Sequence, residues 1–342
     1  GRFLLDGTMR TSEHGNRPRW AGQSGFFEIW FLVVFEPGAR RAWWFRYTTF
    51  APVRGAARAT LWAAAFDAGS PLPVLAGKTV LPISAYAADA GGVRLGEARF
   101  ANGACRGALE IGGRAIAWDL AFTPRPREAR RGPWLLEVLP LPTRVSHAND
   151  AVSFRGWVSV DGQRRALADA PGVQKHIWGT RRVEELFWLY CPGFAGADGR
   201  LEATAVRLRR QLPGGLLAPV LAPVWAHVAG ETLDWCSLPA ILGTRVTHVA
   251  PGELRVEARS LTRRLRAHAW CDPRTLAAWV YRDPAGSDVY VAQSDVASCE
   301  LEVCTRAHPF TAWRPTARLM ATHTALEFHA PEPLAGVRYL PW

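Results

Sequence analysis

The chain has 342 residues with a formal net charge of +11, and 49% of the residues are hydrophobic and 21% charged. This balance excludes a disordered chain and leaves room for two domains with substantial cores. Arginines scattered along the chain supply nearly all of the positive charge without a recognisable nucleic-acid-binding motif, so we expect no nucleic acid as a partner.

Two aromatic-rich segments within residues 26–50 open the series of predicted strands. A hairpin between them would set Glu28 and Arg46 on a common surface among aromatic rings. Such a partly buried charged pair is either a structural ion pair or a polar anchor for the head group of a ligand. We therefore include Trp30, Trp44 and Arg46 among the candidate ligand-binding residues.

Alternation of apolar and polar residues continues along the chain, for example in residues 114–122 and 153–160. Two-residue turn signals such as Asp161-Gly162 follow these segments, as hairpins require. Residues 59–68 fit either a short helix or a strand. Evidence for helices is thin elsewhere, so the predicted fold class is all-β, built from antiparallel meanders.

Membrane-spanning helices and metal sites find little support in the sequence. No segment reaches the roughly 20 consecutive apolar residues that a spanning helix needs, and residues 1–10 do not resemble a signal peptide. We expect a cytoplasmic protein, with contact to a membrane surface left open. The cysteines are spread without metal-ligand spacing, so we expect no metal and no cofactor. One strand face with His323, Glu327 and His329 is the remaining pattern to inspect for metal.

A crowded stretch, residues 173–191, combines charged and aromatic residues in a short span. We predict a loop after Gly179 that leads into a strand. His176, Glu184 and Glu185 are candidate catalytic residues, because a histidine beside aromatic rings or a desolvated glutamate can hold a transferable proton near neutral pH. The alternative is a hydrogen-bonded structural histidine beside solvated glutamates.

The same stretch supplies candidate ligand-binding residues. Trp178, Trp188 and Tyr190 are the candidate wall of a cavity, because aromatic side chains offer large apolar faces. Arg181 is a candidate polar anchor for the ligand.

The sequence "KHIWGTRRVEELFWLYC" resembles a segment of the lipocalin-like group that contains carotenoid 1,2-hydratase and tocopherol cyclase. His176, Trp178 and Gly179 match the H-x-W-G part of that segment, and Trp188 lies in the aromatic strand that follows. The hairpin "FRGWVSVDGQ" is similar to a G-x-V-x-x-D-G hairpin of the same group.

This resemblance implies two lipocalin-like antiparallel β-barrel or half-barrel domains with few short helices. We place them at residues 1–140 and 141–342, with the Pro/Arg-rich segment 123–134 as part of the connection. A weak internal repeat is consistent with two related domains, and chance similarity in a chain rich in Ala and Arg is the alternative.

The resemblance also implies a function. It predicts a hydrophobic isoprenoid-like or polyketide-like small molecule in an aromatic-lined cavity, and acid-assisted hydration, cyclisation or isomerisation by a hydratase or cyclase. Lys175 stands where hydratase-like relatives carry an acid, which weakens a direct transfer of the hydratase mechanism. A non-catalytic carrier of a lipid or pigment on the same fold is therefore the alternative, and the oligomeric state stays open.

Overall fold

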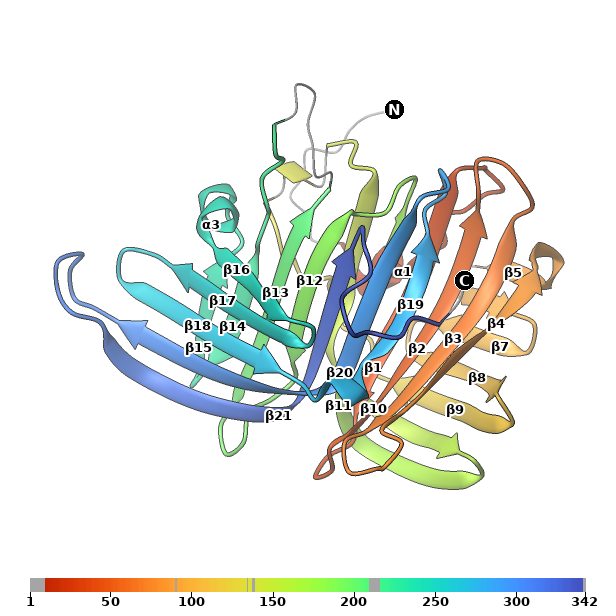
Figure 1. Cartoon of the computed structure of the whole chain (residues 1–342), viewed down its shortest axis with the longest axis horizontal. Helices are drawn as coiled ribbons and strands as arrows, with labels where there is room; N and C mark the ends of the chain where they lie inside the picture. Colours follow the sequence, from red (N-terminus) through yellow and green to blue (C-terminus); the bar gives the residue numbers. More distant parts are fainter. Residues whose placement is uncertain (1–9, 90, 134, 137–138, 209–215, 341–342) are drawn as a thin grey trace.

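The computed structural model describes residues 10–89, 91–133, 135–136, 139–208 and 216–340. Two curved antiparallel sheets, of eleven and ten strands, carry most of these residues and lie side by side (Figure 1). The predicted all-β class with two lipocalin-like barrel or half-barrel units is confirmed. Within the described residues, no helix is long and apolar enough to cross a membrane.

The first sheet has the strand order β4-β3-β2-β1-β11-β10-β9-β8-β7-β6-β5 and curls into a nearly closed barrel. Near the closure, β4 meets β8 so tightly that a Cβ atom at Gly77 would lie 2.7 Å from Ile111. The strands of this sheet are β1 (Phe26–Phe35), β2 (Arg41–Ala51), β3 (Arg58–Asp67), β4 (Val74–Pro82), β5 (Tyr86–Asp89), β6 (Gly92–Leu95), β7 (Ala98–Ala101), β8 (Ala104–Ile111), β9 (Arg114–Phe122), β10 (Thr143–Val160) and β11 (Gln163–Gly179).

The second sheet has the order β15-β14-β13-β12-β21-β20-β18-β17-β16, and β19 pairs with β20 outside this path. Its strands are β12 (Glu185–Cys191), β13 (Gly199–Arg207), β14 (Val224–Val228), β15 (Glu231–Trp235), β16 (Arg245–Ala250), β17 (Glu253–Arg259), β18 (Arg263–Trp270), β19 (Ala277–Arg282), β20 (Asp288–Thr305) and β21 (Arg314–Ala330). The helices are short, namely α1 (Ser12–Asn16), α3 (Leu238–Gly243) and the 3₁₀ turns η1 (Ile83–Ala85) and η2 (Pro273–Thr275).

Three apolar cores explain the pattern of the strands. One fills the first barrel, one lies within the curve of the second sheet, and the third lies between the sheets. All ten residues of β1 are buried because one face of this strand packs in the first barrel and the other against the second sheet. A strand covered on both faces lacks the polar face that simple alternation would show.

The structure settles the local predictions. Residues 59–68 fall largely in β3, so the strand alternative holds there, and the predicted loop after Gly179 leads into β12. The expected common surface of Glu28 and Arg46 is wrong. The β1–β2 pairing sets Arg46 opposite Phe31 and Glu28 opposite Thr49. Because side chains alternate across a strand, Glu28 and Arg46 point to opposite faces of the sheet.

The passage between the sheets lies later in the chain than the division predicted at residue 140. Both β10 and β11 belong to the first sheet, so the chain changes sheet between Gly179 and Glu185. Residue 134 of the Pro/Arg-rich segment and residues 137–138 lie outside the described residues. That segment precedes the two longest strands of the first sheet, and its proline content therefore did not mark the sheet boundary.

Candidate functional site

His176, the first predicted catalytic residue, is completely buried on the barrel face of β11. Its Nδ1 atom donates to the carbonyl oxygen of Gly15 at 2.7 Å, and its Nε2 atom lies 2.9 Å from Oε1 of Glu28. The ring stacks on Trp30 with centroids 4.5 Å apart and also contacts Trp178 at 4.6 Å. Both ring nitrogens and both ring faces are thus occupied by the protein itself.

Glu28 extends this contact to the N-terminal segment. Its carboxylate accepts hydrogen bonds from the backbone N–H groups of Arg19, at 2.6 Å, and Trp20, at 2.9 Å. The Glu28–His176 pair therefore fastens residues 15–20 to the barrel, which favours the alternative of a hydrogen-bonded structural histidine.

Glu184 and Glu185, the other predicted catalytic residues, lie where the chain enters the second sheet. Both are partly exposed, and each lies near an arginine: Arg181 Nη2 is 3.4 Å from Glu184, and Arg207 Nε is 3.5 Å from Glu185. These glutamates are thus partly exposed and lie near arginines, whereas His176 is completely buried. Arg181, the predicted anchor, is also partly exposed.

The predicted ligand-binding residues divide between the two faces of the first sheet. Trp30 and Trp178 belong to the barrel face with His176. The other members lie between the sheets, where they meet residues from both sides. These are Trp44, Arg46, Trp188 and Tyr190. Most of the predicted ligand-binding residues therefore lie on the face between the sheets.

Cations cross this face of the first sheet in a single row. Cross-strand neighbours from β11 to β4 are, in order, Lys175, Phe31, Arg46, Trp62 and Lys78. The facing row of the second sheet contains Trp188, Glu327 and Gln293 on β12, β21 and β20. A row with three cations thus lies against a sheet that carries buried carboxyl groups, within an otherwise aromatic core.

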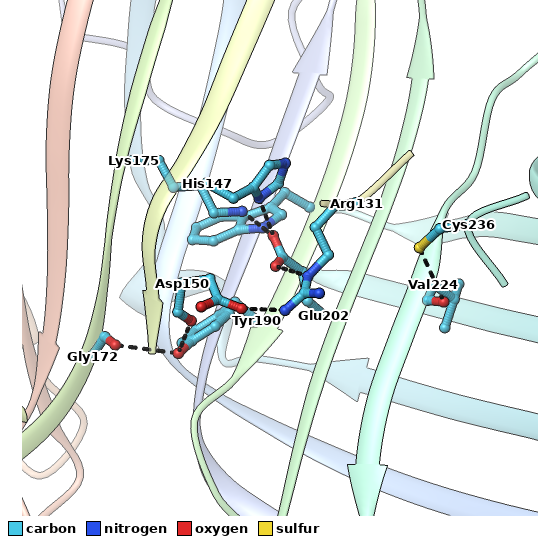
Figure 2. A network of polar contacts seen from close by, with 10 residues as sticks. Arg131, His147, Asp150, Gly172, Lys175, Tyr190, Glu202, Val224 and Cys236 are labelled. Carbon is cyan, nitrogen blue, oxygen red and sulfur yellow. Dashed lines mark hydrogen bonds and ion pairs between the residues drawn. The ribbon is translucent and has the colours of Figure 1, made fainter. Parts of the chain in front are cut away.

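At one end of this junction, Glu202 is the centre of a buried ion-pair network (Figure 2). Its carboxylate pairs with Lys175 Nζ, lies 3.4 Å from Arg131 Nε and accepts a hydrogen bond from Trp188 Nε1 at 3.0 Å. Arg131 also pairs with Asp150. Two cations and two carboxylates therefore balance one another here.

Burial changes the protonation of this network. It lowers the pKa of Lys175 well below the ordinary value, and nearby Arg131 lowers it further. It likewise lowers the pKa of His147, with Lys175 and Arg131 adding to the effect, so this imidazole is neutral at pH 7. Lys175, which replaces the acid expected from the resemblance, contacts Glu202.

A further buried carboxyl group is that of Asp295 on β20, which has no exposed surface. Gln293 Nε2 donates to both carboxyl oxygens, at 3.0 and 2.9 Å. Burial raises the pKa of Asp295; the hydrogen bond from Gln293 opposes this effect and the charge of Glu327 adds to it, which gives a pKa of about 8. Asp295 is therefore mainly protonated at neutral pH, in the way that buried catalytic acids are. Glu327 pairs with His329 on the same strand.

Sequence reasoning missed Asp295 and valued Glu327 only as part of a metal pattern. Among the described residues, no group of three or more His, Cys, Asp or Glu side chains could hold a metal ion. Asp295 lies within an irregularity in the β20–β21 pairing, between Ser294 and Ala297. Alternation alone cannot predict the face of a residue at such a position.

A cavity of about 260 Å³ lies at the other end of the junction. Residues of β3, β4 and β19 line it, together with the turn between β8 and β9; they include Trp62, Lys78, Trp279 and Glu110. Burial, together with the nearby charges of Arg58 and Arg46, lowers the pKa of Lys78 to about 8. Its ammonium group lies 4.8 Å from the centre of the Trp62 ring.

A wider groove of about 790 Å³ lies on the second sheet, away from the junction. Arginines and glutamates alternate across its strands, with Arg266 Nε 2.9 Å from Glu257 and Arg318 Nη2 3.2 Å from Glu302. These partly exposed groups pair with one another, so we place the candidate site at the junction and not in this groove.

The fold and the junction define a class of protein, two lipocalin-like units with an aromatic core between them that contains buried carboxyl groups. No protein-family model matches the chain. It is similar to the probable chloroplastic tocopherol cyclase of Oryza sativa subsp. japonica and the chloroplastic tocopherol cyclase of Zea mays, each 26% identical over 80 residues. These matches cover 23% of this chain and only 17% of each relative.

Solved structures share the fold over almost the whole chain. Kievitone hydratase from Nectria haematococca has a TM-score of 0.57 at 9% identity, and the match covers 94% of this chain and 93% of that one. CghA with Sch210972 gives 0.53 at 12%, covering 94% and 93%. A putative AttH from Nitrosomonas europaea gives 0.51 at 12%, covering 89% and 92%. The predicted remote relationship to the lipocalin-like hydratase and cyclase group is confirmed.

Proposed function

We propose that this protein is an enzyme that binds an apolar small molecule between its two sheets and promotes its acid-assisted hydration, cyclisation or isomerisation. The observation that carries the proposal is the completely buried Asp295 carboxyl group beside Glu327, within a junction walled by aromatic side chains. A hydratase and a cyclase stand among the similar proteins, which supports this type of chemistry.

Each part of this arrangement meets a requirement of the reaction. A carboxylic acid in a dry surrounding keeps its proton until a substrate atom takes it. Aromatic faces such as those of Trp44 and Trp188 stabilise the positive charge that develops on a protonated double bond. Either water then adds, or an internal group closes a ring.

In the proposed reaction, the number of protons given to the substrate equals the number released by it. Asp295 gives one proton to the substrate, and the added water or the ring-closing group releases one. Glu327 next to His329 is the acceptor we assign, since this pair lies in the row beside Gln293. Return of the proton to Asp295 completes the cycle without any cofactor.

The test is incubation of the purified protein in D₂O with polyenes and prenylated phenols, kievitone among them, followed by mass spectrometry. Hydration adds the mass of one water, cyclisation gives an isomer of changed retention, and each product carries deuterium at the protonated carbon. Asp295→Asn should abolish the product, whereas Glu185→Gln should not. An apolar ligand that is extracted unchanged in stoichiometric amount, with no conversion of any probe, would instead identify a lipid or pigment carrier.

A further inference from the structure

Two buried arginines flank one tyrosine at the junction. Arg46 on β2 is 3% exposed and Arg182, in the loop before β12, is 6% exposed. Their guanidinium carbons lie 4.2 Å and 5.1 Å from the centre of the Tyr281 ring. Two like charges thus share one aromatic surface inside the protein.

Within the described part of the chain, neither guanidinium group has all of its N–H donors hydrogen-bonded, although Arg46 also interacts with the Tyr281 hydroxyl. Arg46 donates through Nε to Thr48 Oγ1 at 3.0 Å, and Arg182 donates through Nε to the carbonyl of Arg282 at 3.0 Å. The Nη2 atom of each arginine is buried without a hydrogen-bond partner. Among the described residues, no ion pair joins either guanidinium group to a carboxylate. Glu327 and Asp283 act on Arg46 and Arg182 only as nearby charges, and Asp283 accepts a hydrogen bond from the backbone N–H of Arg182.

This arrangement lowers the stability of the fold. A buried charge without a counter-ion destabilises a fold unless something pairs with it. Burial and, to a smaller extent, the nearby Arg46 together lower the pKa of Arg182 to about 9, as expected for two neighbouring buried cations. An anion between them would remove both penalties.

A third unused donor lies next to this pair. Trp279 Nε1 is buried without a partner, and its ring packs on Trp44 at 5.3 Å and on Trp62 at 5.5 Å. Trp279 and Trp62 also line the cavity of about 260 Å³, with Lys78 beside them. The atoms without a partner in this region are therefore Trp279 Nε1 and the Nη2 atoms of Arg46 and Arg182, which are all donors.

We propose that Arg46 and Arg182 bind an anionic oxygen group, of the carboxylate class, at one end of the otherwise apolar ligand. The inference deepens the proposed function, because it names the polar group of the molecule that the same junction binds. The planar guanidinium group suits a carboxylate, since it presents parallel N–H donors to two oxygens. The aromatic rings around Tyr281 exclude the water that would otherwise weaken this contact.

Thermal unfolding with matched probes tests this proposal. Each carboxylate in a series from octanoate to oleate, and retinoate, is compared with the alcohol of the same chain, such as retinol. The carboxylates should raise the Tm of the wild-type protein more than their alcohols. Arg46→Met and Arg182→Met should abolish that difference, while Arg155→Met, at an exposed position of β10, should retain it.

The ligand-free variants give an independent readout. Removing one of two repelling buried charges should leave the Tm of ligand-free Arg182→Met unchanged or higher, whereas a merely structural arginine would lower it. The proposal is overturned if no carboxylate stabilises the wild type more than its alcohol, or if both variants keep the preference. This measurement does not need turnover. If the protein prefers carboxylates but converts no substrate, the proposal of catalysis fails while the proposal of carboxylate binding stands.

Discussion

Replacing Asp295 by asparagine should stabilise the protein while removing its activity. The pKa of Asp295 is about 8 in the fold, against an ordinary value of 3.8. At pH 7 the unfolded chain has an ionised Asp295 and the folded chain a protonated one. Folding must therefore take up a proton, and it becomes less favourable as the pH rises.

The magnitude follows from this difference. Between pH 3.8 and pH 7 there are about 3 pH units, and at about 1.4 kcal/mol per unit the cost to stability is about 4 kcal/mol. The cost is nearly absent below pH 4, grows with pH and levels off above about pH 8, where the folded-state group also ionises. Asparagine cannot ionise, so Asp295→Asn should remove the whole pH-dependent term.

Asparagine also fits the site sterically and can be hydrogen-bonded there. Gln293 Nε2 now donates to Asp295, and Gln293 Oε1 is buried without a partner. Rotation of the Gln293 amide would offer this oxygen to the new N–H group. The substitution therefore need not leave an unpaired donor in the core.

Urea denaturation of both proteins at several values between pH 5 and pH 8 measures the effect. Asp295→Asn should be more stable at pH 7, and its advantage over the wild type should shrink toward pH 5. A loss of stability at pH 7, or a difference that does not change with pH, would refute the reasoning.

Three further substitutions separate the junction from its surroundings. His176→Ala should lower the free energy of unfolding by about 3 kcal/mol, because it removes a buried ring together with its contacts to Glu28 and Gly15, yet the protein that remains folded should keep its activity; urea denaturation and product assay at pH 7 check both. Glu202→Gln leaves Lys175 without its ion-pair partner and should cost about 3–5 kcal/mol, seen as a lower midpoint in the same denaturation assay. Glu185→Gln should change the free energy of unfolding by less than about 1 kcal/mol, because its partly exposed ion pair with Arg207 contributes little. A large loss of turnover in this variant would restore Glu185 as a catalytic candidate.

The fold class and the faces of single strands could be predicted from the sequence, because the alternation of side chains along a strand is a local property. Alternation shows which residues share a face within one strand, so the common face of Trp188 and Tyr190 was predictable. It does not show how one strand registers on the next. The pairing of Arg46 with Phe31 is what separates Arg46 from Glu28, and no local signal in the turn between β1 and β2 revealed it.

Other parts of the site depend on contacts between distant segments. Arg182 lies in a loop, and only the approach of β19 brings it to Tyr281. Asp295 owes its protonation to complete burial between the sheets, which is a property of the assembled fold. Conversely, His176 combines a recognisable motif with aromatic neighbours, and its two ring nitrogens contact Gly15 and Glu28, which hold the N-terminal segment.

Deuterium incorporation from D₂O tests the central claim most directly, because it reports which residue delivers the proton. The measurement compares the wild type, Asp295→Asn and the folded fraction of His176→Ala on one converted substrate. We expect labelled product from the wild type and from His176→Ala, and none from Asp295→Asn. Labelled product from Asp295→Asn at the wild-type rate, with none from His176→Ala, would contradict the assignment of the junction as the site of catalysis.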